Sequence, residues 1–300
     1  MTTFEIEPIG PFSLAAAQDF AGGFTAGIGG GGVEGTSIVM SFPVEGRSVS
    51  AAVDLHEDTS GRIVGRTDTE GGLLPDVIRQ ASRSLSLDHD GSGWPEVGER
   101  DPIIGRAQAM YRYLRPVCFY SAYEAATSFV IGQRISMRQS ARIKERLRES
   151  AGDRATVDGR AYPAFPRPER LLELNEIAGV SAQKVTWLHG VAEAAIDGRL
   201  DTEQLRSMPR DEALAALRAI PGIGPWTAEA IRLRGCGMAD ELPENEEASL
   251  RGAAALYDRP SLDRQGFNGL AEAWRPYRMW AVVLLRVAWN RSSPGGSSRT

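Results

Sequence analysis

A glycine-rich break between two short helical patterns, at residues 217–231, is the feature that most constrains how this chain can fold. Leu214 and Leu217 lie on one face of a first helix, which ends where Pro-Gly-Ile-Gly begins. Glycine adopts positive φ without steric cost, so residues 221–224 can reverse the chain tightly. Pro225 suits the first position of a second helix, where a missing N–H costs nothing. The pattern predicts two helices joined by a tight hairpin.

The predicted hairpin leaves backbone N–H groups free at the start of its second helix. Such groups, together with the helix dipole, favour a bound phosphate. Ile220 and Ile223 are apolar, and we expect them to anchor the hairpin from beneath. Pro-Gly-Ile-Gly alone fits an ordinary αα-hairpin equally well. The longer sequence, which continues Pro-Trp-Thr-Ala, is much more specific.

Composition places the chain among ordinary globular proteins. Its 300 residues, 42% hydrophobic and 24% charged, suggest about two domains. An uninterrupted apolar run of about 18 residues is absent, so no membrane span is expected, and the N-terminus lacks a signal-peptide pattern. Cys118 and Cys236 are far apart and cannot form a metal cluster alone. These features predict a reduced, cytoplasmic setting.

Positive charge is concentrated in the second half of the chain, although the net charge is −5. Residues 1–115 carry 16 acids and 9 bases, whereas residues 134–148 hold six bases against one acid. Residues 251–300 add eight arginines against three acids. Local potential governs phosphate binding more than total charge does. The distribution permits a nucleic-acid partner near the hairpin, although a basic helix can also be a merely solvated face.

The chain divides into an α+β part followed by a helical part. Strand patterns occur at residues 4–7, 37–44, 48–55 and 61–65, with a glycine-rich loop at 27–35 and helices at 74–85 and 101–113. From residue 121 onward the pattern is almost wholly helical, with a linker at 163–168 and a further helix at 266–290. We predict an N-terminal domain over 1–115, a helical subdomain with the hairpin over 116–235, a second helical subdomain over 236–290 and a disordered tail over 291–300.

Several segments, in their order and spacing, resemble the DNA-3-methyladenine glycosylase II family of the helix-hairpin-helix DNA glycosylase superfamily. They are residues 129–136, 165–171, 179–185 and 198–200, the hairpin itself, residues 233–235 and residues 273–281. The resemblance implies an α+β fold, in which an N-terminal antiparallel β-sheet domain of TBP-like topology precedes two all-α subdomains with a cleft between them.

The resemblance also implies an activity. Members of the family bend double-stranded DNA, rotate a modified base into a pocket and hydrolyse its N-glycosidic bond. Bifunctional relatives carry a lysine in the first turn after the hairpin, where this chain has Trp226. We therefore expect a monofunctional glycosylase of base-excision repair, acting as a monomer and requiring no cofactor. A structural Na⁺ or K⁺ at the hairpin is implied on the backbone carbonyls of Arg218, Ile220 and Ile223.

Residues that contact DNA follow from the same resemblance. The amides of Gly222 and Gly224, helped by Thr227, are expected to hold the backbone beside the lesion. Arg134, which follows Gln133, stands at the position of the wedge side chain, which fills the gap left in the base stack when a nucleotide is rotated out. A simple phosphate contact is an equal alternative for Arg134.

The expected catalytic aspartate is missing. In the family it follows Leu-Pro or Phe-Pro and precedes, by three residues, the apolar residue that opens a basic helix. Counting back from Leu250 gives Glu247, and counting forward from Pro243 gives Asn245. Glutamate keeps the charge with about 1.5 Å of extra reach, and misplacement of about 1 Å can cost on the order of 100-fold in rate. A solvated acidic loop at residues 240–247 is the alternative.

The base pocket departs from the family as well. Trp226 and Phe20 match aromatic positions that stack on alkylated, electron-poor bases. Arg286 stands where a further aromatic is expected, and its charge disfavours a cationic base but suits the carbonyl of a neutral one. A phosphate contact or a salt bridge is equally open for Arg286. The sequence thus predicts a DNA glycosylase, with a catalytically weak or inactive DNA-binding member of the family as the alternative and a helical interaction protein as a third.

Overall fold

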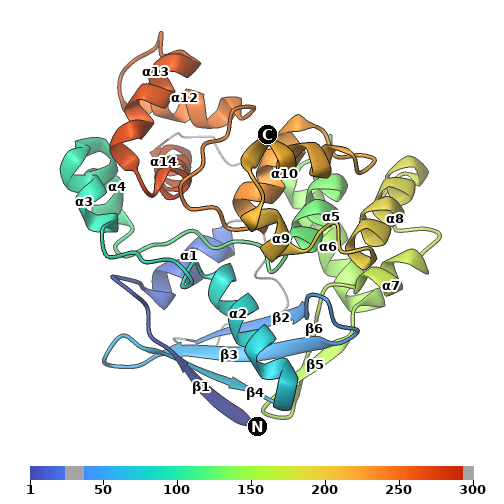
Figure 1. Ribbon diagram of the computed structural model, residues 1–300. Helices are drawn as coiled ribbons and strands as arrows, with labels where there is room; N and C mark the ends of the chain where they lie inside the picture. Colours follow the sequence, from blue (N-terminus) through green and yellow to red (C-terminus); the bar gives the residue numbers. More distant parts are fainter. Residues whose placement is uncertain (24–36, 293–300) are drawn as a thin grey trace.

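A four-stranded antiparallel sheet forms the base of the molecule in the computed structural model, which describes residues 1–23 and 37–292 (Figure 1). The spatial order of its strands is β1-β4-β3-β2. Their bounds are Thr2–Ile6 for β1, Ser37–Pro43 for β2, Ser50–Glu57 for β3 and Ile63–Thr67 for β4. All four predicted strands and the predicted antiparallel sheet are confirmed. The predicted loop at 27–35 lies outside the described residues, as do residues 293–300 of the predicted tail.

Both faces of the sheet are covered. Met40, Phe42 and Leu55 point into the main apolar core, beneath α1 (Leu14–Gly23) and α2 (Leu74–Ser84). Val39 and Ala52 face the other way and pack against a two-stranded hairpin, β5 (Arg154–Val157) and β6 (Arg160–Pro163). Because the sheet is covered on both faces, β2 is buried along almost its whole length and not only at alternate residues. Sequence patterns did not predict this second hairpin.

The remainder of the described chain is helical. The longer helices are α3 (Trp94–Arg100), α4 (Pro102–Met110), α5 (Ala122–Gly132), α6 (Met137–Ala151), α8 (Ala182–Ile196), α10 (Arg210–Arg218), α12 (Glu247–Leu256), α13 (Arg264–Ala271) and α14 (Arg278–Ser292). The shorter ones are α7 (Pro168–Leu172), α9 (Thr202–Ser207) and α11 (Pro225–Ala230), which continues as a π-turn, η2 (Ile231–Gly235). Short 3₁₀ turns, η1 (Gly71–Leu73) and η3 (Glu272–Trp274), complete the set. The single helix predicted at 266–290 is two, because Pro276 separates α13 and η3 from α14.

Two apolar cores divide the helices. The first holds the sheet with α2 to α4 and α12 to α14, and it contains the fully buried Trp274 and Trp280. The second holds α5 to α11. The chain thus leaves the first core near Phe119 and returns near Arg234, and the Phe119 N–H donates to the Arg234 carbonyl at 2.8 Å where the two crossings meet.

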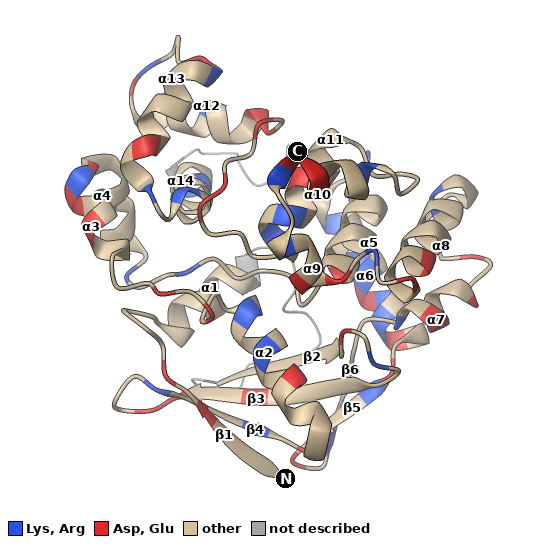
Figure 2. Ribbon diagram, viewed as in Figure 1, with Lys and Arg blue, Asp and Glu red and all other residues tan. Residues whose placement is uncertain are grey.

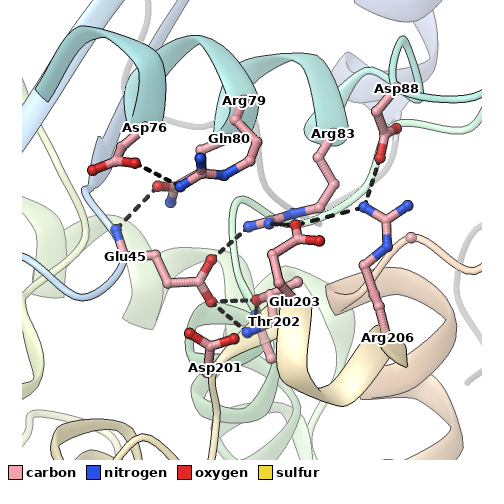
Figure 3. Close-up of polar contacts among 12 residues, drawn as sticks. Glu45, Asp76, Arg79, Gln80, Arg83, Asp88, Asp201, Thr202, Glu203 and Arg206 are labelled. Atoms are coloured by element: carbon pink, nitrogen blue, oxygen red, sulfur yellow. Dashed lines mark hydrogen bonds and ion pairs between the residues drawn. The ribbon is translucent and has the colours of Figure 1, made fainter. Parts of the chain in front are cut away.

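A buried ionic network fastens the sheet to the second core (Figure 3). Arg83 of α2 is 1% exposed, and its guanidinium lies 2.7 Å from a carboxylate oxygen of Glu45 and 2.7 Å from one of Glu203. Glu45, in the turn after β2, also accepts the Thr202 N–H at 2.9 Å. Thr202 is the first residue of α9, and α9 is followed directly by α10, the first helix of the glycine hairpin. This network therefore fixes the position of the hairpin relative to the sheet.

None of the described helices is long and apolar enough to cross a membrane.

Candidate DNA-binding and catalytic site

The glycine hairpin between α10 and α11 has the geometry that its sequence predicts. Gly222 has φ +86°, and a Cβ at this position would lie 2.7 Å from the Trp187 ring, so only glycine fits here. Pro225 is the first residue of α11. Ile220 and Ile223 are buried at 1% and 5% exposure, which confirms that they anchor the hairpin.

The outer side of the hairpin is open. Gly224 is exposed, and a Cβ built on it would meet nothing within 4 Å. Its neighbourhood therefore allows close approach of a ligand backbone to its amide group. Thr227 is only 4% exposed, so its side chain faces the protein interior instead of the outer surface. The structure thus separates Gly224 from Thr227, although both were predicted to contact DNA.

The carbonyl groups predicted to hold a monovalent cation lie at the end of α10 and in the turn. Arg218 is the last residue of α10, and the final carbonyls of a helix lack intrahelical donors. The Ile220 carbonyl already accepts the Ile223 N–H at 3.1 Å. Carbonyl oxygens of this kind suit Na⁺ or K⁺ in type, and the cation stays a prediction.

The loop between α5 and α6 carries the predicted wedge and is tied to the hairpin. Gln133 Nε2 donates to the Gly222 carbonyl at 2.8 Å. Lys184 Nζ donates to the carbonyls of Ile131 at 2.8 Å and of Gln133 at 2.5 Å. Burial, and then the positive charge of Arg134, lower the pKa of Lys184. The fold thus brings Gln133 and Gly222 together, as a common DNA-binding surface requires.

Arg134 itself is exposed at the tip of this loop. Its φ of +56° is in the left-handed region, which is uncommon for a residue other than glycine. Backbone strain of this kind is held only where the surroundings determine it. The geometry leaves the guanidinium outside the protein, which suits both predicted roles, the wedge and the phosphate contact.

The basic segment at 134–148 divides into an exposed and a buried set. Arg138, Arg142 and Arg146 of α6 are exposed with Arg134, whereas Lys144 and Arg148 are buried. Figure 2 shows the basic residues along α6. The exposed arginines add positive potential beside the wedge loop. The interpretation of the basic helix as a solvated face does not hold for Lys144 and Arg148, because both side chains are buried.

The two buried bases belong to a structural ion network. Arg148 Nη2 lies 3.0 Å from a carboxylate oxygen of Glu124, which is itself 1% exposed. Burial, and then the neighbouring Arg148 charge, lower the pKa of Lys144 to about 8. Burial raises the pKa of Glu124. These groups hold α5 against α6 and do not reach the DNA-binding surface.

Trp226 is the large aromatic side chain on the outer side of the hairpin. It is 42% exposed and packs edge-to-face on Phe129, with ring centroids 5.4 Å apart. Phe129 in turn packs on Phe119 at 5.2 Å. Phe129 thus supports the indole on one side while the side chain as a whole remains partly accessible, as stacking with a base would require.

A second group of predicted site residues gathers where α1, η2, α12 and α14 meet. Arg286 Nη1 of α14 lies 2.6 Å from Oε1 of Glu246, the residue that precedes α12. The Arg234 guanidinium lies over the Phe20 ring at 5.7 Å from its centroid. Burial lowers the pKa of Arg234, and the charges of Glu246 and Arg286 act on it in opposite directions. Phe20 and Arg286, far apart in sequence, are thus brought to one charged cluster.

Glu247 and Asn245, the predicted catalytic residues, do not join this cluster. The Glu247 side chain is 69% exposed and pairs with Arg264 at 3.5 Å. Asn245 is exposed as well. The inward-facing carboxylate is Glu246, whose Oε2 also accepts the Ser249 hydroxyl proton. Counting along the sequence did not single out Glu246. Its backbone is extended (φ −105°, ψ 97°), whereas Glu247 is the first residue of α12, so the two adjacent carboxylates point in different directions.

The carboxylates of the acidic loop at 240–247 are paired with arginines, although the side chains of Glu244 and Glu247 remain exposed. Each of its five carboxylates pairs with at least one arginine from another part of the chain, and Figure 2 shows these acids along the loop that leads into α12. The local negative potential is thereby reduced, which removes an obstacle to phosphate binding nearby. The pairs are Asp240 with Arg275 and Arg278, Glu241 with Arg210 and Arg232, Glu244 with Arg210, Glu246 with Arg286 and Glu247 with Arg264.

Two surface hollows, of about 470 and 430 Å³, lie elsewhere. They are lined by residues near Pro11 and Tyr113, and neither includes a predicted site residue. A site that receives an extruded base from DNA need not be a closed cavity beforehand.

Comparisons with known proteins agree with this geometry. No protein-family model matches the chain. It is 28% identical over 217 residues to a DNA-3-methyladenine glycosylase of Bacillus subtilis (strain 168), covering 70% of this chain and 71% of that relative. A 3-methyladenine DNA-glycosylase structure from Archaeoglobus fulgidus superposes with a TM-score of 0.79 at 19% identity, covering 98% and 100% of the two chains.

A third similarity is to the 8-oxoguanine glycosylase/lyase of Clostridium acetobutylicum, solved in complex with double-stranded DNA, with a TM-score of 0.70 at 17% identity over 98% of this chain and 99% of that one. The sheet, the two helical bodies and the glycine hairpin together give the chain the fold of these DNA glycosylases. Among these proteins, the chain is similar in sequence to DNA-3-methyladenine glycosylases and shares their fold.

Proposed function

We propose that this protein is a monofunctional DNA glycosylase that binds double-stranded DNA, extrudes a modified base and hydrolyses its N-glycosidic bond. The observation that carries the proposal is an inward-facing carboxylate, Glu246, held 2.6 Å from Arg286 beside Phe20 and Arg234. A glycosylase of this family needs a carboxylate near the extruded sugar, and Glu246 is placed to supply it in the absence of the usual aspartate.

DNA would be held along the hairpin and the wedge loop. The exposed amide of Gly224 would take a phosphate oxygen, and Arg138, Arg142 and Arg146 would add long-range attraction. Arg134 would enter the stack as the base leaves it, at an unstacking cost of a few kcal/mol. Gln133 would keep this wedge in register with the hairpin, because it is bonded to Gly222. A monovalent cation on the carbonyls of the hairpin would add positive charge near that phosphate.

Cleavage would pass through a cation-like sugar. As the bond from C1′ to the base nitrogen breaks, the base departs with the bonding electrons and positive charge develops on the sugar. The Glu246 carboxylate would stabilise that charge, and a water molecule would then attack C1′ and lose its proton. Trp226 occupies the position of the lysine nucleophile of bifunctional relatives, so we expect no strand cleavage by an enzyme-bound imine.

The cations at the site bear on which base is accepted. Arg286 and Arg234 both carry positive charge, which opposes a cationic alkylpurine and favours a neutral base with a carbonyl oxygen. Trp226 would stack on either kind of base. A modified base is therefore the proposed substrate, alkylated or otherwise, with neutral oxo-bases preferred over cationic ones.

The test is a panel of duplexes carrying 3-methyladenine, hypoxanthine, 1,N6-ethenoadenine, uracil or 8-oxoguanine, each followed by alkali to reveal abasic sites. We expect the wild type to release at least one base, Glu246→Gln to lose the activity and Glu247→Gln to keep it within a few-fold. Activity lost in Glu247→Gln and kept in Glu246→Gln would restore the original assignment to Glu247.

A DNA-binding protein without hydrolysis is the second candidate, favoured by one observation. The Glu246 carboxylate is already neutralised by Arg286, which reduces the charge available to a sugar cation. Duplex affinity without base release on any substrate would establish this alternative. Loss of affinity in Gly224→Ala would exclude a helical protein that does not bind DNA.

We further infer a cytoplasmic monomer. Cys118 and Cys236 are both buried free thiols, as suits a reducing compartment.

A further inference from the structure

Glu229 is a buried carboxylate on the second helix of the hairpin, and it binds the backbone of the acidic loop. It lies in α11 and is 3% exposed. Its Oε2 accepts the N–H of Asn245 at 2.8 Å, and both of its oxygens accept the N–H of Glu244 at 3.2 Å. Arg210, the first residue of α10, lies 3.2 Å from Oε1. The carboxylate thus joins α11 to α10 through Arg210 and to one short stretch of loop through the amides of Glu244 and Asn245.

The side chains of the loop are held by ion pairs with arginines, but its backbone has no regular pairing of its own. Residues 236–246 connect η2 to α12 without a helix or strand. On its carbonyl side, Arg210 donates to Leu242 at 3.1 Å, and Arg264 donates to Pro243 at 3.1 Å. On its amide side, Glu229 fixes the two residues immediately before Glu246. A buried carboxylate is retained only where charged or N–H partners compensate its desolvation, so this contact is specific and not incidental.

We propose that Glu229 is a positioning residue that sets the place of the Glu246 carboxylate and couples it to the DNA-binding hairpin. The inference rests on the function proposed above, because it assigns Glu246 a catalytic role. Glu229 follows Pro225 by one helical turn, so a shift of the hairpin on a bound phosphate is transmitted through α11 to residues 244–245. Glu229 itself does not touch the extruded nucleotide. It acts through the loop backbone.

The proposal predicts a separation of DNA binding from chemistry. Glu229→Gln keeps the size of the side chain but replaces one accepting oxygen by a donating amide, which opposes either the two N–H groups at Oε2 or the Glu244 N–H and Arg210 at Oε1. A displacement of Glu246 of about 1 Å would lower the rate on the order of 100-fold. We expect the single-turnover rate of Glu229→Gln to fall 30- to 100-fold, on the order that this displacement implies, while its Kd for abasic-site duplex stays within about twofold.

A matched control is available in the same ionic group. Glu244→Gln also removes a carboxylate partner of Arg210, at 3.3 Å, but the Glu244 side chain is 66% exposed and its backbone N–H remains bound to Glu229. Its rate should stay within about twofold of wild type. Glu229→Asp retains the charge with shorter reach, so its rate should lie between those of Glu229→Gln and wild type.

A readout independent of catalysis is hydrogen exchange at the amides of Glu244 and Asn245, which should be faster in Glu229→Gln and unchanged in Glu244→Gln. If Glu229→Gln does not fold, the same rate, affinity and exchange measurements on Glu229→Asp decide the question. Wild-type rate and exchange in the Glu229 variant, with Glu246→Gln inactive, would overturn this inference alone. A wild type inactive on every duplex would overturn the glycosylase itself and this role with it. Rate and affinity lost together, in proportion to melting temperature, would reduce Glu229 to a structural residue.

Discussion

Glu246 and Arg286, forty positions apart in the sequence, form an ion pair of 2.6 Å between the residue before α12 and the middle of α14. The carboxylate stands one position before the predicted Glu247, and the arginine stands where an aromatic is expected. A carboxylate placed beside a cation has a defined direction and charge.

Arg286→Leu should change substrate preference. Hydrogen bonds to charged groups contribute about 1.5–3 kcal/mol, so the rate on a neutral oxo-base should fall about 10- to 100-fold. The rate on 3-methyladenine should fall less, because a repulsive charge is removed together with the hydrogen bond. The measurement is the ratio of single-turnover rates on hypoxanthine and 3-methyladenine duplexes. Arg291→Leu, on the exposed end of the same helix, is the control, and equal losses on both duplexes would contradict a role in base selection.

The two hairpin glycines should separate stability from DNA binding. Gly222→Ala should destabilise the fold by about 2 kcal/mol or more, because φ is +86° and the new methyl would lie 2.7 Å from Trp187. Gly224→Ala has φ −87° and open space, so its melting temperature should stay near wild type while its affinity for duplex DNA falls. Thermal melts and fluorescence anisotropy make the comparison. Normal DNA affinity in Gly224→Ala would argue that this face does not approach the DNA backbone.

Arg134→Gly tests the strained tip of the wedge loop. The left-handed conformation costs a non-glycine residue about 1–2 kcal/mol, and glycine loses about 0.5–1 kcal/mol of stability through its greater freedom when unfolded. The variant should therefore unfold at the wild-type temperature or slightly above it, yet release bases more slowly. Arg138→Gly, in the first turn of α6, lacks the strain and should lower the melting temperature. Destabilisation of Arg134→Gly would show that the arginine side chain supports the fold.

Lys144 predicts a pH dependence of stability. Its pKa of about 8 in the fold lies below the ordinary value of 10.5, so between these values the unfolded chain binds more protons than the native one. Stability from this group therefore rises with pH across that window, by at most about 3 kcal/mol. Relative to Lys144→Met, the wild type should gain stability from pH 8 to pH 10. Parallel curves of melting temperature for the two proteins would show that Lys144 titrates normally.

Arg83 tests the junction between the sheet and the second core. Arg83→Met leaves the Glu45 carboxylate without its buried cation, and breaking a buried pair in this way costs about 3–5 kcal/mol. Arg79→Met, one turn earlier on α2, removes only an exposed pair with Asp76 and should cost less than about 1 kcal/mol. Urea unfolding of both variants measures the difference. Equal effects would mean that the network of Figure 3 contributes no more than surface charge does.

Local rules predicted the hairpin because its conformation is decided within a few residues. Positive φ at Gly222 and the helix start at Pro225 both follow from the residue types themselves. The hairpin of β5 and β6 was not predicted, although Asp158 and Gly159 both take positive φ there, as an Asp-Gly turn favours. Its strands are only four residues each, too short for an alternating pattern to stand out.

The candidate site was harder to predict because its charges belong to residues from separate elements. Sequence counting located the acidic loop and pointed to Glu247 or Asn245, but it could not show which carboxylate faces Arg286, since that depends on where α12 begins. It also could not show that five carboxylates meet arginines from α10, η2, α13, α14 and the turn at Arg275. Such pairings form only when the two cores are assembled.

The return of the chain to its first core near Arg234 has a consequence for biosynthesis. All residues of the second core, up to Cys236, are synthesised before the residues of α12 to α14. The second core can therefore assemble early, while the apolar surface around Met40 and Leu55 is covered only after Trp280 and its neighbours have been synthesised. The pair of Glu246 and Arg286 can therefore be completed only after α14 has been synthesised, later than every residue of the second core.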